Sequence, residues 1–155
     1  YLHHHLWEPV WEHTPAWMQM VCKQFVDAGA DIVVSHGVPV LHGVEIYNGK
    51  PIFYSLGNFI FQPFSEANVW LNDRIWLSVV ATCEYDGDRL ARIDFVPLAA
   101  CSQDALRSAS FVERDAPEIA TGEYATKVLG WLKELSARFG TTVNVEGERA
   151  SISVG

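Results

Sequence analysis

The sequence predicts an α/β protein, with α+β as the alternative class, and three observations carry that prediction. A helical pattern over residues 14–29 leads through a glycine into the apolar run 31–35, which is the helix-and-strand unit of a layered domain. Two turn dipeptides, Asn48-Gly49 and Asp86-Gly87, each separate two segments rich in strand-forming residues. A second amphipathic helix follows over residues 124–139.

The first helix is bounded by recognisable signals at both ends. Thr14 is the expected N-cap residue, Pro15 suits the first helical position, and Gly29 supplies the stop. Apolar residues recurring at helical spacing predict the buried face of this helix: Trp17, Val21, Phe25 and Met18.

Residues 31–35 then predict a buried strand, and 44–47 with 51–55 a hairpin. A turn and a short apolar run follow over 56–61. A second hairpin is expected from 75–85 and 90–97, and a last one from 142–145 and 150–154. Residues 99–120 give no clear pattern. The start of the chain resembles the middle of a strand, so we expect residues 1–155 to be one domain that is the C-terminal part of a longer one.

Composition narrows the class of protein. Hydrophobic residues make up 49% of the 155 residues and charged residues 19%, which is typical of a folded domain with a sizeable core. The net charge of -8 argues against general binding to nucleic acid or to anionic membranes. Apolar runs all end well short of the roughly 18 residues of a membrane-spanning helix. The three cysteines form no disulfide or zinc pattern and are expected to be buried small hydrophobes.

Histidines gather in two short segments, His3-His4-His5 and the stretch from His36 to His42. His36 ends the predicted buried strand, which is where an α/β protein places a metal ligand or a catalytic base. Imidazole is a good ligand for zinc, iron and manganese, and Gly37 lets the backbone turn sharply or approach a ligand. From position alone, a histidine that merely bonds a backbone carbonyl is the stronger reading of His36.

The other polar candidates are also open to two interpretations. His42 is either a group that holds a ligand in place or an ordinary loop histidine. On a strand, His3 and His5 would share one face and could chelate a metal. Glu45 and Asn58 are candidates for substrate binding. The alternative is that Glu45 is an exposed strand residue and that Asn58 is a turn residue.

The amino-acid sequence of several segments resembles the CapA family of bacterial poly-γ-glutamate and capsule biosynthesis proteins. The resemblance runs from Phe25-Val26-Asp27-Ala28-Gly29-Ala30-Asp31, through His36-Gly37 and Leu41-His42-Gly43-Val44-Glu45, to the specific run Tyr54-Ser55-Leu56-Gly57-Asn58-Phe59. It implies a fold similar to calcineurin-like metallophosphoesterases, a β-sandwich flanked by helices. It also implies that His3 and His36 match late histidine motifs of a divalent metal site, with His5 a further candidate, and that manganese, zinc or iron would suit it.

Two departures from the family pattern matter. Many relatives carry further histidines where this chain has Gly37 and Pro39. The early Asp, Asn and His motifs of the family lie upstream of the residues that match here, so this chain alone would hold a half-site. Half of a two-layer fold would also expose strand edges and tend to pair or aggregate.

Two functions therefore remain. The first is a metal-dependent hydrolase of capsule or poly-γ-glutamate synthesis, in which His42 is the catalytic candidate and Glu45 and Asn58 bind an anionic polymer or phosphoester. The alternative is a non-catalytic envelope component that binds an anionic polymer or a membrane synthase. Both place the protein at the bacterial cell envelope, attached through a region outside this sequence, with the cytoplasm as the other option.

Overall fold

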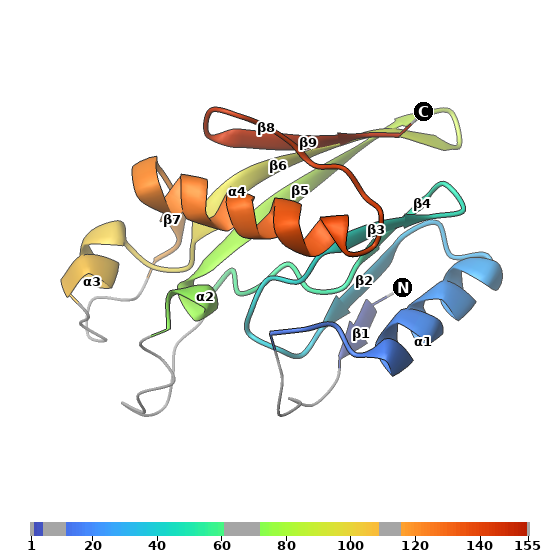
Figure 1. Cartoon of the computed structure of the whole chain (residues 1–155), viewed down its shortest axis with the longest axis horizontal. Coiled ribbons are helices and arrows are strands. Elements are labelled where there is room, and N and C mark those ends of the chain that lie inside the picture. The colour runs from blue at the N-terminus through green and yellow to red at the C-terminus, as the bar shows by residue number, and fades with distance from the viewer. Residues whose placement is uncertain (1, 5–11, 61–71, 109–115, 155) are drawn as a thin grey trace.

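The computed structural model describes residues 2–4, 12–60, 72–108 and 116–154, and these form two β-sheets with helices around them (Figure 1). The α/β class predicted from the sequence is confirmed. The helices of the described part are α1 (Ala16–Asp27), α2 (Asp73–Trp76), α3 (Gln103–Ser108) and α4 (Gly122–Ala137).

The first sheet has the strand order β1-β2-β4-β3 and is largely parallel. Strands β1 and β2 run parallel, as do β2 and β4, while β3 and β4 form the antiparallel hairpin predicted around Asn48-Gly49. Both turn residues have positive φ, 50° and 75°, which is why this dipeptide suits the turn. The strands are β1 (Leu2–His4), β2 (Val33–His36), β3 (Val44–Tyr47) and β4 (Lys50–Phe53).

The second sheet is antiparallel throughout, in the order β5-β6-β9-β8, with the short strand β7 paired to β6. Its long hairpin turns at Gly87, where the sequence predicts a turn, and the last two strands form the predicted terminal hairpin. The strands are β5 (Leu77–Asp86), β6 (Arg89–Ala99), β7 (Glu118–Ile119), β8 (Asn144–Glu146) and β9 (Arg149–Ser153).

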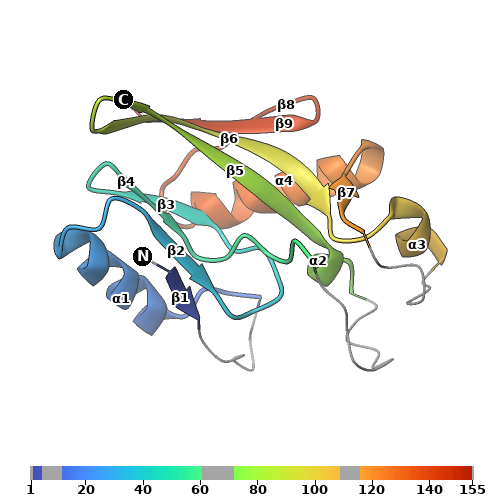
Figure 2. The same cartoon turned by 180° about the vertical axis from the view of Figure 1, so that it is seen from behind.

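The main core lies between the two sheets and against α4. Phe53 and Val44 of the first sheet, Phe95 and Ile93 of the second, and Leu132 of α4 all belong to one buried apolar cluster. Figure 2 shows the second sheet lying over the first, with α4 passing alongside both. Burial of this apolar surface is the main stabilising contribution to the fold.

The opposite face of the first sheet is covered by α1, which forms a smaller cluster of its own. Its buried apolar residues are Met18, Cys22, Val26, Val33, Ile52 and Tyr54. The predicted buried face of the helix is therefore wrong by one position, because Trp17 is 38% exposed while Met18 is fully buried. Two adjacent stripes of the helix are apolar, and the stripe of Met18, Cys22 and Val26 is the one that packs against the sheet.

The outer edge of β3 is protected by hydroxyl groups that come from the far end of the chain. The backbone N–H of Val44 donates to Ser136 Oγ at 3.0 Å, and the N–H of Ile46 donates to Thr141 Oγ1 at 3.2 Å. These bonds satisfy backbone donors that an open edge strand would leave available for pairing with another chain. They also fix the end of α4 against the first sheet.

Other sequence expectations need small corrections. Residues 73–76 form the short helix α2 where the sequence predicts the start of a strand, because Asn72 caps the backbone N–H of Arg74. The unpatterned stretch contains α3 and β7. Cys22 and Cys101 are buried as expected, but Cys83 is only partly buried because it lies on β5, the edge strand of the second sheet.

Candidate functional site

The carboxyl ends of β1 and β2 lie side by side and bring the two histidine segments together. The Cα register pairs Leu2 with Val34, His3 with Ser35, and His4 with His36. The family resemblance implies that His3 and His36 belong to one metal site, which stays a prediction. In parallel sheets this edge, beyond the carboxyl ends of the strands, is the usual location of ligands. His5 lies outside the described residues.

His36 is the last residue of β2 and is exposed to solvent. Side chains alternate along a strand, so His36 shares a face with Val34, which packs against the main core. Ser35 points to the α1 side and is buried, and its Oγ makes no hydrogen bond within the described part of the chain. A buried hydroxyl without a partner is costly, which marks this strand end as a place where a further polar group would be accommodated.

The chain turns away from the strand end at Gly37, whose φ is 139°. Residues with a side chain rarely adopt such a value, so this backbone favours glycine. After the turn, Val38 and Val40 re-enter the core.

His42 is buried, with 1% of its surface exposed. Its backbone N–H donates to Ser55 O at 3.0 Å, which extends the β3–β4 hairpin by a further pair. The next residue, Gly43, meets α4 closely, because a Cβ added there would lie 2.5 Å from the carbonyl oxygen of Leu135. The His-Gly pair is therefore part of the contact between the hairpin and α4, and the catalytic role of His42 stays a prediction.

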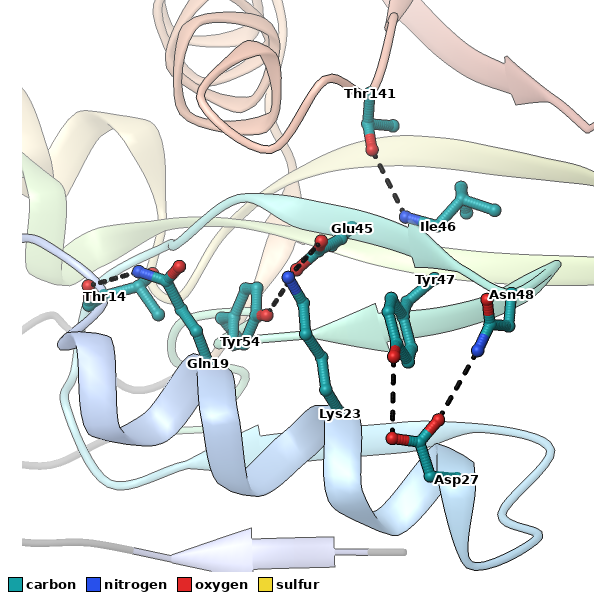
Figure 3. A network of polar contacts seen from close by, with 10 residues as sticks. All are labelled: Thr14, Gln19, Lys23, Asp27, Glu45, Ile46, Tyr47, Asn48, Tyr54 and Thr141. Atoms are coloured by element: carbon teal, nitrogen blue, oxygen red, sulfur yellow. Dashed lines mark hydrogen bonds and ion pairs between the residues drawn. The ribbon is translucent and has the colours of Figure 1, made fainter.

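Glu45 lies at the centre of a buried polar network between β3 and α1 (Figure 3). Its Oε1 is 2.8 Å from Lys23 Nζ, and its Oε2 accepts a 2.6 Å hydrogen bond from the Tyr54 hydroxyl. The ammonium of Lys23 also lies 5.2 Å from the centre of the Tyr47 ring. Both carboxylate oxygens are thus occupied, which gives Glu45 a structural role. The proposed contact with substrate stays a prediction.

This network shifts the ionisation of its neighbours. Burial, with a smaller contribution from the Glu45 carboxylate, raises the pKa of the Cys22 thiol to about 11. Burial and the hydrogen bond to Glu45 raise the pKa of Tyr54 well above its usual value. Both groups therefore remain protonated near neutral pH, and neither is an activated nucleophile.

Asn58 is buried at the turn that leads from the first sheet toward the second. Its side-chain Nδ2 donates to the carbonyl of Ile75 at 3.0 Å, and the Ser78 hydroxyl donates to its backbone oxygen at 2.6 Å. These bonds are those expected of a turn residue that satisfies buried backbone groups. Asn58 also borders a hollow of about 270 Å³ beside β5, so a substrate contact stays a prediction.

The described residues do not by themselves complete a metal site. Within residues 2–4, 12–60, 72–108 and 116–154, no group of three His, Cys, Asp or Glu side chains is arranged to hold a metal ion. Zinc sites need three or four protein ligands, and calcium and magnesium need six or more oxygen or water ligands. The exposed strand-end position of His36 suits one ligand of such a site.

Comparison with known proteins finds relatives for part of this chain. The family described as "Bacterial capsule synthesis protein PGA_cap" matches residues 2–63, which include β1, α1, β2 and the β3–β4 hairpin. The PGA biosynthesis protein CapA of Bacillus subtilis is 54% identical over 43 residues, which are 28% of this chain and 11% of that protein. The chain is thus similar to the CapA proteins over part of its length.

Two further relatives show how much of the family the chain represents. The capsule biosynthesis protein CapA of Bacillus anthracis is 45% identical over 36% of this chain and 14% of its own length. The uncharacterized protein y4sH of Sinorhizobium fredii is 29% identical over 88% of this chain and 37% of its own length. The chain thus spans little more than a third of that relative. Across the described helices of the chain, none is long and apolar enough to cross a membrane.

Sequence reasoning found the histidine-bearing strand ends but missed several residues that shape their surroundings. Lys23 and Tyr54 hold Glu45, and Ser136 holds the edge of β3. The only local signal for Tyr54 was its place in the distinctive Tyr-Ser-Leu-Gly-Asn-Phe run. Lys23 and Ser136 carry no local signal, because their partners are distant in the sequence.

Proposed function

We propose that this chain acts in the synthesis of an anionic capsule polymer at the bacterial cell envelope, and that its chemical site is the carboxyl edge of β1 and β2. The observation that supports the site most strongly is His36, exposed at the end of a parallel strand. Its Cα is aligned with that of His4 in the neighbouring histidine-bearing strand. Relatives of the family carry the names PGA and capsule biosynthesis protein, which supports the biological setting.

The reaction proposed for this edge is metal-dependent hydrolysis of a phosphoester or of a linkage in the polymer. His36 is the proposed ligand of a divalent ion, and His3 and His5 are the further candidates from the sequence. The register places His3 opposite Ser35, one position from His36, so His36 carries the assignment. Manganese, zinc and iron all suit imidazole ligands. The remaining ligands would lie outside the described residues, since the described ones provide too few.

The buried polar residues near this edge have supporting roles in the proposal. His42 would position a ligand, because its burial and its contact with the hairpin keep it in one place. A direct proton transfer from His42 would require the substrate to reach a side chain that is 1% exposed. Glu45 and Asn58 would shape the surroundings through the bonds that they already make.

The direct test is hydrolysis of bis(4-nitrophenyl) phosphate by the full-length protein with added Mn²⁺. His36→Ala should lower the rate by at least about tenfold, because disturbing the coordination of a catalytic metal typically costs that much. Asn144→Ala is the control, since it truncates an exposed polar side chain on β8 of the second sheet. A rate unchanged in His36→Ala would contradict the assignment of the site.

A second function, a non-catalytic envelope component, is favoured by one specific observation. The backbone at Gly37 has a φ of 139°, which disfavours the histidine that many relatives carry there. Such a protein would bind an anionic polymer or a membrane synthase without cleaving it. Sedimentation of the full-length protein with poly-γ-glutamate, combined with no hydrolysis by the wild type in Mn²⁺, would support this second function over the first.

A further inference from the structure

A polar hollow lies between the start of α1 and the end of α4. Its volume is about 240 Å³, compared with about 30 Å³ for a water molecule in the liquid, so a small polyatomic group fits. The lining residues are His13, Thr14, Gln19, Leu135, Arg138 and Phe139.

The hollow is at the same edge of the first sheet as the strand-end histidines. Helix α1 follows β1 in the chain and ends at Asp27, whose carboxylate reaches Tyr47 and Asn48 at the turn that precedes β4. The end of the helix therefore lies at the amino end of β4, and its start lies at the carboxyl end. Figure 3 shows the same arrangement, with Thr14 and Gln19 at the start of the helix and Asp27 at its other end.

Arg138 gives this hollow a positive charge that no described carboxylate neutralises. Its Nη1 is 2.8 Å from His13 Nδ1, and within the described part of the chain it forms no ion pair. In contrast, Lys23, Lys50 and Lys127 each contact a carboxylate. An uncompensated guanidinium beside a hollow is notable in a chain whose net charge is -8.

The hydrogen-bond roles in the Arg138–His13 pair leave donors directed at a ligand. A guanidinium can only donate, so His13 Nδ1 is the acceptor, and the proton of the neutral ring is on Nε2. His13 Nε2–H and the remaining N–H groups of Arg138 are then donors on the polar side of the hollow. Leu135 and Phe139 add apolar side chains to the lining, which suits a charged group carried on an aliphatic chain.

We propose that this hollow binds an oxyanion, a carboxylate or phosphate group, through Arg138 and His13. The guanidinium fork matches both groups in geometry. The site requires no metal, so its test is independent of the metal site proposed at His36. A ligand chain that is held here by one anionic group would pass along the edge where His36 is exposed.

The test is calorimetric titration of the EDTA-treated full-length protein with inorganic phosphate and, separately, with glutarate. Removing metals first ensures that phosphate bound at a metal is not counted. Arg138→Gln should weaken binding by about tenfold or more, the factor that corresponds to losing one charge-assisted hydrogen bond. Arg89→Gln is the matched control, because it removes the same charge at a different hollow, beside the β5–β6 turn.

The outcomes separate the sources of the oxyanion. Binding of phosphate but not of glutarate indicates a phosphorylated ligand, and binding of glutarate indicates a polycarboxylate. Either result supports the site when Arg138→Gln weakens that binding by about tenfold or more. Arg138→Lys, with circular dichroism as a check on folding, keeps the charge and should retain part of the affinity. The proposal is overturned if neither probe binds the wild type, or if Arg138→Gln and Arg89→Gln bind equally well.

Discussion

The two faces of the first sheet are held by different kinds of interaction, and adjacent residues show the difference. Phe53 faces the main core, where the buried neighbours are apolar, and Tyr54 faces α1, where its hydroxyl bonds a buried carboxylate. The core face contributes stability through packing, which depends on area and shape. The α1 face combines a small apolar cluster with charged groups. Each of these groups destabilises the fold if its hydrogen-bond or ion-pair partner is missing. The candidate site lies at the edge where these two faces end.

The largest effect that separates the faces should come from Phe53→Ala. The side chain is 3% exposed and belongs to the main core, so truncation leaves a cavity. We expect the free energy of unfolding to fall by about 3–5 kcal/mol. Urea denaturation followed by circular dichroism measures this. A smaller loss of unfolding free energy in Phe53→Ala than in Glu45→Ala would contradict the view that the core face dominates stability.

Removal of the Glu45 carboxylate should have the next largest effect. In Glu45→Ala, Lys23 and Tyr54 both lose their partner inside a partly closed environment. The expected loss of unfolding free energy is about 2–3 kcal/mol, the range for hydrogen bonds that involve a charged group. Glu45→Gln is the matched control, because it keeps an acceptor for the Tyr54 hydroxyl and should cost less. Equal losses in the two variants would show that the charge on Glu45 is irrelevant.

The α1 face should also make stability fall in alkaline solution. The folded state raises the pKa of the Cys22 thiol from 9.0 to about 11, so between these values it holds a proton that the unfolded chain releases. Unfolding free energy should then decrease by about 1.4 kcal/mol per pH unit through this group. Tyr54, whose pKa is also raised, adds to the decrease at still higher pH.

Cys22→Ala isolates the thiol contribution. Urea denaturation of both proteins between pH 8 and pH 11 gives the two slopes, and the raised pKa of Cys83 affects both equally. The wild-type slope should be the steeper one above pH 9. Parallel slopes would mean that Cys22 releases its proton equally easily in the folded and unfolded states.

Local signals in the sequence predicted the elements whose cause is local. The Asn48-Gly49 turn and the helix stop at Gly29 follow from backbone conformations that favour these residues, and all three positions have positive φ. His36 at the end of β2 was predicted for the same reason, because an apolar strand and a following glycine identify a strand end.

Features made by distant residues could not be predicted in this way. Val44 and Ser136 are separated by 92 residues, and His13 and Arg138 by 125. Neither pair leaves a periodic pattern, since each contact arises only when α4 packs against the first sheet. The buried face of α1 was missed for a related reason, because the sheet, and not the helix pattern, decides which of two apolar stripes is covered.

The smallest effect on stability should come from His36 itself. It is exposed at the end of a strand, so His36→Ala should change the free energy of unfolding by no more than about 0.5 kcal/mol. Urea denaturation under the same conditions as for Phe53→Ala provides the comparison. A larger loss would mean that His36 supports the fold, and would weaken its assignment as a functional residue.

The central claim is that the carboxyl edge of β1 and β2 binds a divalent metal through His36. Titration of Mn²⁺ into the full-length protein, with free Mn²⁺ followed by electron paramagnetic resonance, measures this directly. We predict that the wild type and Asn144→Ala bind Mn²⁺ alike, and that His36→Ala binds it at least about tenfold more weakly. Equal affinity of His36→Ala and the wild type would contradict the claim.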